Sequence, residues 1–232
     1  MQIVEVSVTG VRSAVITLQR DQSPMRFILF PMIHLGTPAF YQAVTSRLRD
    51  TQLIVAEGVA GRSVVTNALT LSYRLPARSR RLNLVVQRID YLGLGVPVIR
   101  PDITARQLRR RWRAVPALQR MAVWCLIPPF AIAVWLFGTR RVMGRYLGLD
   151  DLPASKAQPE RDIAGELVEL IVDHRDALLI DALVSIHEAR STEPIAVAVV
   201  YGAGHMPAVV RALLARYGYR PRAADWLTVF DF

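Results

Sequence analysis

Two of the four histidines follow apolar segments in the same way. His34 comes after FILFPMI and His205 comes after IAVAVVYGAG, and each is followed within a few residues by a proline and a predicted helix. Glu57 ends a third apolar segment, LIVAEGV. Ligands bind at the carboxyl ends of strands in α/β sheets, so we expect these three side chains to meet at one edge of a sheet. Two imidazoles and a carboxylate suit a first-row divalent metal ion.

Three further residues are candidates for the same site. Arg175 begins RDALLIDAL, where an Arg-Asp pair is expected to open a helix, and its rigid guanidinium could bind a substrate carboxylate or orient Glu57. Gly202 and Gly204 would let the backbone approach a ligand closely. Each candidate has a structural alternative. A histidine can cap a strand, and an Arg-Asp pair can be a surface ion pair that contributes little.

The remaining polar residues have less distinctive contexts. His174 and His187 are expected at the surface without a role in chemistry, and Asp102, at the end of VPVIRPD, is a candidate second carboxylate. The sequence contains no Gly-x-Ser-x-Gly elbow and no P-loop. These absences argue against a serine hydrolase and against a P-loop nucleotide site.

Alternating and helical apolar patterns predict the elements that position these residues. The predicted strands are MQIVEVSV, SAVITLQR, MRFILFPMIHLG, QLIVAEGV, VPVIRPD, IAVAVVYG and DWLTVFDF. The predicted helices are TPAFYQAVTSRLRD with Thr37 as N-cap, part of residues 61–83, LNLVVQRIDYLGL, TARQLRRRWRAVPALQR, two stretches within RDIAGELVELIVDHRDALLIDALVSIHEA, and MPAVVRALLARYG. A linker is expected near LPASKAQPE. We therefore predict an α/β fold: a central mixed sheet flanked by helices in one domain over residues 1–232, with an apolar helical insert at about residues 104–150.

Composition narrows the function classes. The chain has 232 residues, 52% of them hydrophobic, and a formal net charge of +10. Of its 29 basic residues only Lys156 is a lysine, and no nucleic-acid-binding module accompanies the charge, so no nucleic-acid partner is expected. The single cysteine, Cys125, excludes an internal disulfide and a zinc ribbon. The first residues alternate like a strand and carry no basic segment, so we expect a cytoplasmic protein.

Residues 121–138 form an uncharged apolar stretch with arginines on both sides. As one helix it would be about 27 Å long, near the lower limit for a membrane span. Pro128-Pro129 interrupts it, and the flanking charge gives no clear orientation. Three interpretations stay open: a helical hairpin packed on the domain, an element at a membrane surface, and a true span. We expect a kinked helix pair that leaves both halves of the chain on one side of any membrane.

Together these residues resemble the TraB/PrgY pheromone-shutdown family and its Tiki and GumN relatives. The pattern of that family is a first Gly-x-x-His, a Glu, a late Arg-Asp or Arg-Asn pair and a second Gly-x-x-His. Gly202-Ala203-Gly204-His205 and Glu57 match it, as does Arg175-Asp176, whereas Pro31 replaces the first glycine before His34. The resemblance covers about residues 25–60 and 170–212. It implies an α/β fold and, for Tiki relatives, metal-dependent peptide cleavage.

Three functions follow as hypotheses. The first is a metal-dependent, peptidase-like hydrolase acting on a peptide or small molecule, in which His34, His205 and Glu57 hold a divalent metal ion. There Glu57 could also be the general base, and Arg175 would stabilise an oxyanion or hold a substrate carboxylate. The second is a non-catalytic metal-, haem- or peptide-binding protein. The third is a membrane-associated regulatory protein that makes peripheral membrane contact through residues 121–138. The oligomeric state is left open.

Overall fold

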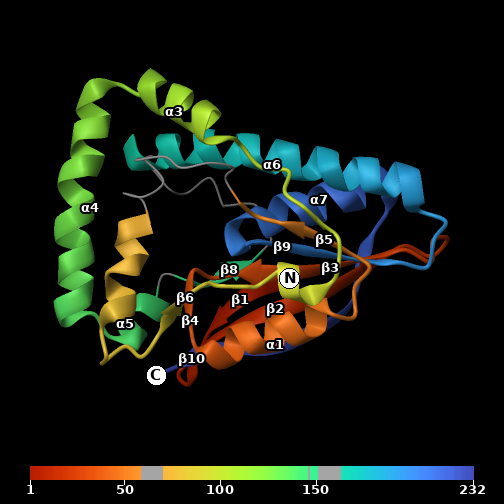
Figure 1. Cartoon of the computed structure of the whole chain (residues 1–232), viewed down its shortest axis with the longest axis horizontal. Helices are drawn as coiled ribbons and strands as arrows, with labels where there is room; N and C mark the ends of the chain where they lie inside the picture. Colours follow the sequence, from red (N-terminus) through yellow and green to blue (C-terminus); the bar gives the residue numbers. More distant parts are fainter. Residues whose placement is uncertain (59–69, 146, 151–162) are drawn as a thin grey trace.

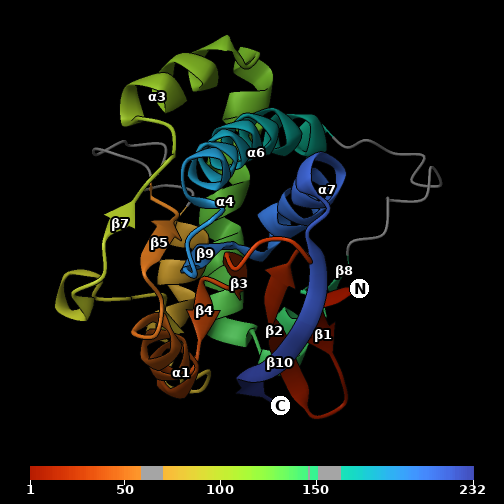
Figure 2. The ribbon, with the colours of Figure 1, turned by 90° about the vertical axis from the view of Figure 1, so that its right-hand side faces the viewer.

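The computed structural model describes residues 1–58, 70–145, 147–150 and 163–232, and its centre is a mixed β-sheet. The eight strands described in this sheet follow the order β7 (Val98–Ile99), β5 (Leu53–Ala56), β9 (Ala196–Gly202), β3 (Arg26–Met32), β2 (Gly10–Gln19), β1 (Gln2–Val6) and β8 (Leu149–Asp150), with β10 (Arg220–Asp231) paired to β2. Helices α6 (Ile163–Arg190) and α7 (Met206–Tyr217) lie on one face, and α1 (Pro38–Leu48) lies on the other (Figures 1 and 2). The predicted α/β class is therefore confirmed.

The three strands that precede the candidate residues are neighbours and run parallel. β9 pairs with β3 from Arg26–Ala196 to Met32–Gly202, and it pairs with β5 on its other side. All of β9 except Gly202 is buried, as expected for an apolar strand covered on both faces. Because the strands are parallel, His34, Glu57 and the Gly202 turn all follow the same edge of the sheet.

The antiparallel half of the sheet is built around β2. Strand β10 pairs along β2 from Gly10 to Gln19, while β1 and β3 pair with separate halves of β2. β10 begins at Arg220 and is longer than the predicted DWLTVFDF. A second, two-stranded sheet joins β4 (Leu35–Gly36) to β6 (Val85–Val86) in antiparallel register.

Helix α1 begins as its sequence predicts. The Thr37 side chain accepts a hydrogen bond from the backbone N–H of Phe40, and Pro38 occupies the first helical turn, where its missing N–H costs nothing. Phe40, Val44 and Leu48 are buried at helical spacing. The helix thereby covers the sheet face opposite α6 and α7.

Two predicted elements differ in the structure. The helix predicted over LNLVVQRIDYLGL is wrong. Leu82 and Leu84 are buried while Asn83 and Val85 are exposed, an alternation that belongs to extended chain, and only the short turn η2 (Leu92–Leu94) is helical. The two helical stretches predicted near the C-terminal half form one helix, α6, because no proline interrupts the segment. Of the helix predicted in 61–83, residues 70–74 are helical and η1 (Pro76–Arg78) follows, while 61–69 and the linker LPASKAQPE lie outside the described residues.

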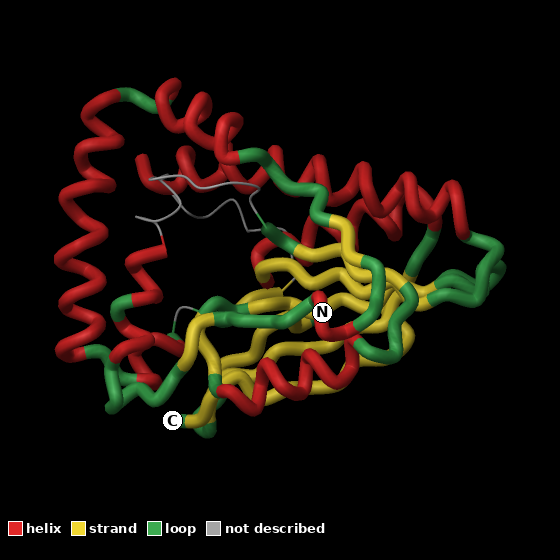
Figure 3. Tube along the Cα trace, in the orientation of Figure 1, coloured by secondary structure: helices red, strands yellow, loops and turns green. Residues whose placement is uncertain are grey.

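The insert consists mainly of helices, as predicted. It contains α3 (Ala105–Ala114), α4 (Ala117–Phe137) and the short α5 (Arg140–Gly144), visible as successive helices in Figure 3. α4 is one continuous helix, so the predicted split at Pro128-Pro129 is wrong. Two adjacent prolines remove hydrogen bonds from a single stretch of the helix, and the turns on both sides continue.

Candidate active site

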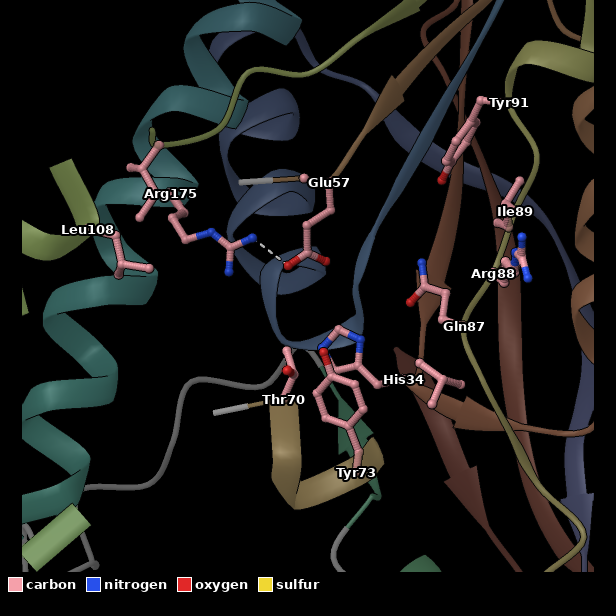
Figure 4. Close-up of a pocket in the computed structure, with 13 residues that line it drawn as sticks. His34, Glu57, Thr70, Tyr73, Gln87, Arg88, Ile89, Tyr91, Leu108 and Arg175 are labelled. Atoms are coloured by element: carbon pink, nitrogen blue, oxygen red, sulfur yellow. Dashed lines mark hydrogen bonds and ion pairs between the residues drawn. The ribbon is translucent and has the colours of Figure 1, made fainter. Parts of the chain in front are cut away.

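A cavity of about 600 Å³ lies at the sheet edge where the candidate residues gather, within the usual size range of small-molecule sites. Its walls come from the ends of β3 and β5, from the chain after β6, and from α3 and α6. Figure 4 shows the side chains of His34, Glu57 and Arg175 directed toward one another at this cavity. The lining residues are His34, Glu57, Gly58, Thr70, Tyr73, Val86, Gln87, Arg88, Ile89, Tyr91, Ile103, Leu108 and Arg175.

Glu57 is held by hydrogen bonds at both carboxylate oxygens. Oε1 accepts from Nη2 of Arg175, and Oε2 accepts from the backbone N–H of Gly202 at 2.8 Å. Burial opposes ionisation of this carboxyl, but the charge and hydrogen bond of Arg175, with smaller contributions from His34 and His205, outweigh it and lower the pKa of Glu57. Glu57 is therefore an anion at neutral pH.

Arg175 is shared between Glu57 and a second carboxylate, Asp102. Nε and Nη2 of Arg175 donate to the two oxygens of Asp102 at 2.9 and 2.8 Å. Asp102 is fully buried and also accepts from the backbone N–H groups of Gly58 at 3.1 Å and Ile103 at 2.7 Å. Burial disfavours the charged guanidinium, but the hydrogen bond to Asp102 and the charge of Glu57 prevail and raise the pKa of Arg175. The fork geometry fixes Arg175, and through it Glu57.

His34 stands at the cavity wall between an aromatic ring and an amide. Its ring stacks on Tyr73 with centroids 4.8 Å apart and planes 21° apart. The backbone N–H of Gln87 donates to the His34 carbonyl at 2.8 Å, which extends the pairing of β4 with β6 by one residue. Directly opposed residues project to the same face, so the side chains of His34 and Gln87 are neighbours.

Gln87 has a buried side-chain oxygen that finds no hydrogen-bond partner among the described residues. Its Oε1 atom is buried and accepts no hydrogen bond from the part of the chain that the structure describes. Such a group is costly unless a ligand or water supplies a donor. Gln87 also lines the cavity, so its side-chain amide lies beside the space that a ligand would occupy.

Two tyrosines complete the polar wall. Burial, opposed by Arg100 and supported by the charge of Glu57, raises the pKa of Tyr91 to about 12. Burial likewise raises the pKa of Tyr73, against a smaller opposing effect of Arg74. Both phenols therefore stay protonated at neutral pH and can donate hydrogen bonds.

His205 lies behind Glu57 and is not part of the cavity lining. It is buried, and its Nδ1 atom is hydrogen-bonded to Asp176 on α6. A Cβ atom placed on Gly202 would be 3.3 Å from Oε2 of Glu57 and 3.6 Å from Cδ2 of His205. His205 and Glu57 therefore both lie close to the side of Gly202 on which a side chain would project.

The structure brings most of the predicted residues together. His34, Glu57 and Arg175 share the cavity, with Gly202 in contact with Glu57. A Cβ on Gly204 would meet nothing within 4 Å, so no described group requires a glycine there.

Other sequence expectations at the site need correction. Arg175 and Asp176 lie inside α6 and do not open a helix. His187, expected at the surface, is buried with its Nδ1 atom 3.1 Å from the hydroxyl of Tyr219. Asp102, a candidate second carboxylate from its position after a strand, lies at the site as the partner of Arg175. Gln87 was missed by the sequence analysis.

The side-chain donors at the site do not match a metal centre. Over residues 1–58, 70–145, 147–150 and 163–232, no group of three or more His, Cys, Asp and Glu side chains is placed to hold a metal ion. Both oxygens of Glu57 accept hydrogen bonds, and Nδ1 of His205 is bonded to Asp176, which leaves Nε2 as the remaining ring nitrogen of His205. The metal ligation predicted for His34, His205 and Glu57 stays a prediction.

Comparison with protein-family models, curated proteins and solved structures gives no match for this chain. The resemblance to the TraB/PrgY family stays a prediction from the quoted motifs. The geometry of the cavity is therefore the basis for the function proposed below.

Proposed function

We propose that this protein is a hydrolase that cleaves an amide bond in a small peptide or a related small molecule bound in the cavity. The observation that carries the proposal is that the His34 imidazole shares the cavity wall with the ionised Glu57 and the amide of Gln87. A base, an adjacent carboxylate and a substrate-binding group are the parts that hydrolysis by an activated water requires.

His34 is the general base in this proposal. Its side chain is accessible from the cavity, and stacking on Tyr73 fixes the plane of the ring. The ring would take a proton from a water molecule as that water attacks the substrate carbonyl, and it would give this proton to the leaving amine as the C–N bond breaks. The negative charge of Glu57 would stabilise the imidazolium that forms. Glu57 itself is a weak base, because Arg175 favours its ionised form.

Gln87 would hold the substrate amide beside His34. A primary carboxamide both donates and accepts, so it pairs with the N–H and the carbonyl of a peptide group. Ile89, Ile103 and Leu108 supply apolar wall for the substrate side chains. These features favour a peptide over an ester or a sugar.

Negative charge on the substrate carbonyl would be stabilised by the tyrosine hydroxyls. Tyr73 and Tyr91 are protonated donors at the cavity. Arg175 is already bonded to two carboxylates, so we assign it a positioning role: it holds Glu57 beside His34.

A peptide cleavage assay tests this proposal. Purified protein is incubated with a defined mixture of short peptides, and new termini are identified by mass spectrometry. We expect cleavage that persists with a chelator, because the base in this proposal is the His34 imidazole and not a metal-bound water. Cleavage that is lost with chelator and restored by zinc would instead support the metal hypothesis. Peptide binding without cleavage would contradict the proposal and favour a binding protein.

Gln87→Leu tests the substrate assignment. Removing one amide hydrogen bond should raise KM for the best peptide up to about tenfold with a smaller change in kcat. Gln42→Leu, the same change on the exposed surface of α1, is the matched control and should behave like the wild type. An unchanged KM in Gln87→Leu would remove Gln87 from the site.

A further inference from the structure

Helix α4 carries an apolar surface that the rest of the described chain leaves uncovered. It has 21 residues, and an 18-residue stretch of it has a mean hydropathy of 1.7 and is only 6% buried. In Figure 1 it stands at one end of the molecule, away from the sheet. Its exposed large apolar side chains are Leu118, Met121, Trp124, Leu126, Phe130, Ile132, Trp135, Leu136 and Phe137. An exposed apolar surface of this kind marks a site of interaction.

The helix is fixed to the body of the protein at both ends. Trp124 meets Trp112 of α3 edge to face, with ring centroids 6.2 Å apart. At the other end, Nη2 of Arg81 donates to the carbonyls of Leu136 and Gly138 at 2.7 and 2.9 Å. Ala131 on the inner side is fully buried. The outward apolar surface is therefore presented by a positioned helix.

Exposed arginines lie beyond both ends of α4. The exposed arginines of α3 precede it, and two more follow its C-terminal end; they are Arg106, Arg109, Arg110, Arg113, Arg141 and Arg145. A long apolar surface with cations at each end matches an anionic lipid layer, in which apolar side chains enter the acyl boundary and guanidinium groups meet phosphates.

The sheet topology excludes a crossing by α4 alone. Strands β3 and β5 precede α4 in the sequence, whereas β9 follows it and lies between them. A single crossing would place β9 on the other side of the bilayer from its two partners. An orientation along the membrane surface keeps all three strands on one side of the bilayer.

The same charges argue against a second copy of the chain as the occupant. Because both ends of α4 are flanked by arginines, parallel and antiparallel pairing alike would bring cations against cations. Such like-charge contacts cost affinity. An anionic surface has the complementary charge at both ends.

We propose that α4 lies in the plane of an anionic membrane surface, with its apolar side chains at the acyl boundary and the flanking arginines on lipid phosphates. This contact is independent of the proposed hydrolysis. It would hold the protein at the membrane while the sheet and the cavity stay in the aqueous phase.

Vesicle flotation tests the contact. Wild-type protein should float with vesicles of phosphatidylcholine and phosphatidylglycerol and should bind much less to phosphatidylcholine alone. The double variant Leu126→Asn, Phe130→Asn should lower the partition coefficient at least about tenfold. Its control is Leu92→Asn, which changes an exposed leucine outside α4. Arg109→Gln and Arg113→Gln should each lower the partition coefficient about fivefold, and Arg211→Gln on α7 should change it little.

Depth measurement separates lying on the membrane from crossing it. Cys125 is exposed, lies within α4 and is the single cysteine of the chain, so it accepts one environment-sensitive fluorophore. We expect stronger quenching by a nitroxide near the lipid headgroups than by one near the chain ends. Stronger quenching at the chain ends would overturn the proposal. So would binding that ignores anionic lipid, absence of vesicle binding, or a lipid-free dimer that the α4 variants dissociate.

Discussion

Glu57 has its pKa lowered in the folded protein because Arg175, its partner, favours the carboxylate over the buried acid. A group with a depressed folded pKa stabilises the fold above its unfolded pKa, and this stabilisation is lost as the pH falls through the folded value. Glu57→Gln should therefore lower the free energy of unfolding by about 3 kcal/mol at neutral pH. This difference in stability from the wild type should shrink below a pH of about 4. Urea unfolding of both proteins across this range measures it.

The control for this prediction is an exposed ion pair. Glu193 pairs with Arg190 at the surface, so Glu193→Gln should leave the unfolding midpoint unchanged. A Glu57→Gln protein as stable as wild type at neutral pH would contradict the assigned role of Arg175.

His187 gives a second pH signal in a different range. Burial and the nearby Arg20 lower its pKa, so the folded protein favours the neutral ring. Stability should therefore fall as the pH drops below about 6.5, the unfolded value. In a His187→Gln variant this part of the pH dependence should disappear, which thermal unfolding between neutral and mildly acidic pH can detect. An unchanged pH profile would argue against the lowered pKa.

Single residues at strand ends could be anticipated from the sequence, and their partners could not. The apolar segments before His34 and Glu57 show where each strand stops, and parallel pairing then brings the two residues to one edge. The partnership of Arg175 with Asp102 depends on how α6 passes that edge, which residue spacing does not specify. Gln87 lies beside His34 because its backbone N–H pairs with the His34 carbonyl, a contact between distant segments of the sequence.

At the scale of elements, the end of β9 constrains the site closely through Gly202. A Cβ on Gly202 would approach Oε2 of Glu57 to 3.3 Å, whereas a Cβ on Gly204 would meet nothing within 4 Å. Gly202→Ala should displace the Glu57 carboxylate and destabilise the protein by about 1–2 kcal/mol, with a larger loss of activity. Gly204→Ala is the matched control, and its stability and activity should both be near those of the wild type. Equal effects of the two changes would contradict the close approach of Gly202.

The regular elements were predicted well where one pattern dominated. β9, α1 and the strands of the first residues follow their apolar periodicity and caps. The helix predicted around Leu82 and Leu84 was wrong because a short apolar run fits both a helix and an extended chain. The prediction for α4 was wrong for a different reason: its two prolines predicted a break, but the helix continues past them.

At the scale of the whole molecule, strands from both sides of the insert form one sheet. The two halves of the chain must therefore stay in one compartment. After Cys125→Ser, single cysteines at Asp90 and Glu188, both exposed, should react equally with a membrane-impermeant thiol reagent in intact cells. Opposite reactivity of the two sites would contradict a single shared sheet.

The most direct test of the proposed hydrolase is chemical rescue at His34. The side chain borders the cavity and is exposed, so His34→Ala should fold normally and leave space for a small base. Peptide cleavage should fall about a hundredfold or more, and added imidazole should restore part of it. Cleavage by His34→Ala at the wild-type rate, or a loss that imidazole does not rescue in a folded protein, would contradict the role of His34 as the base.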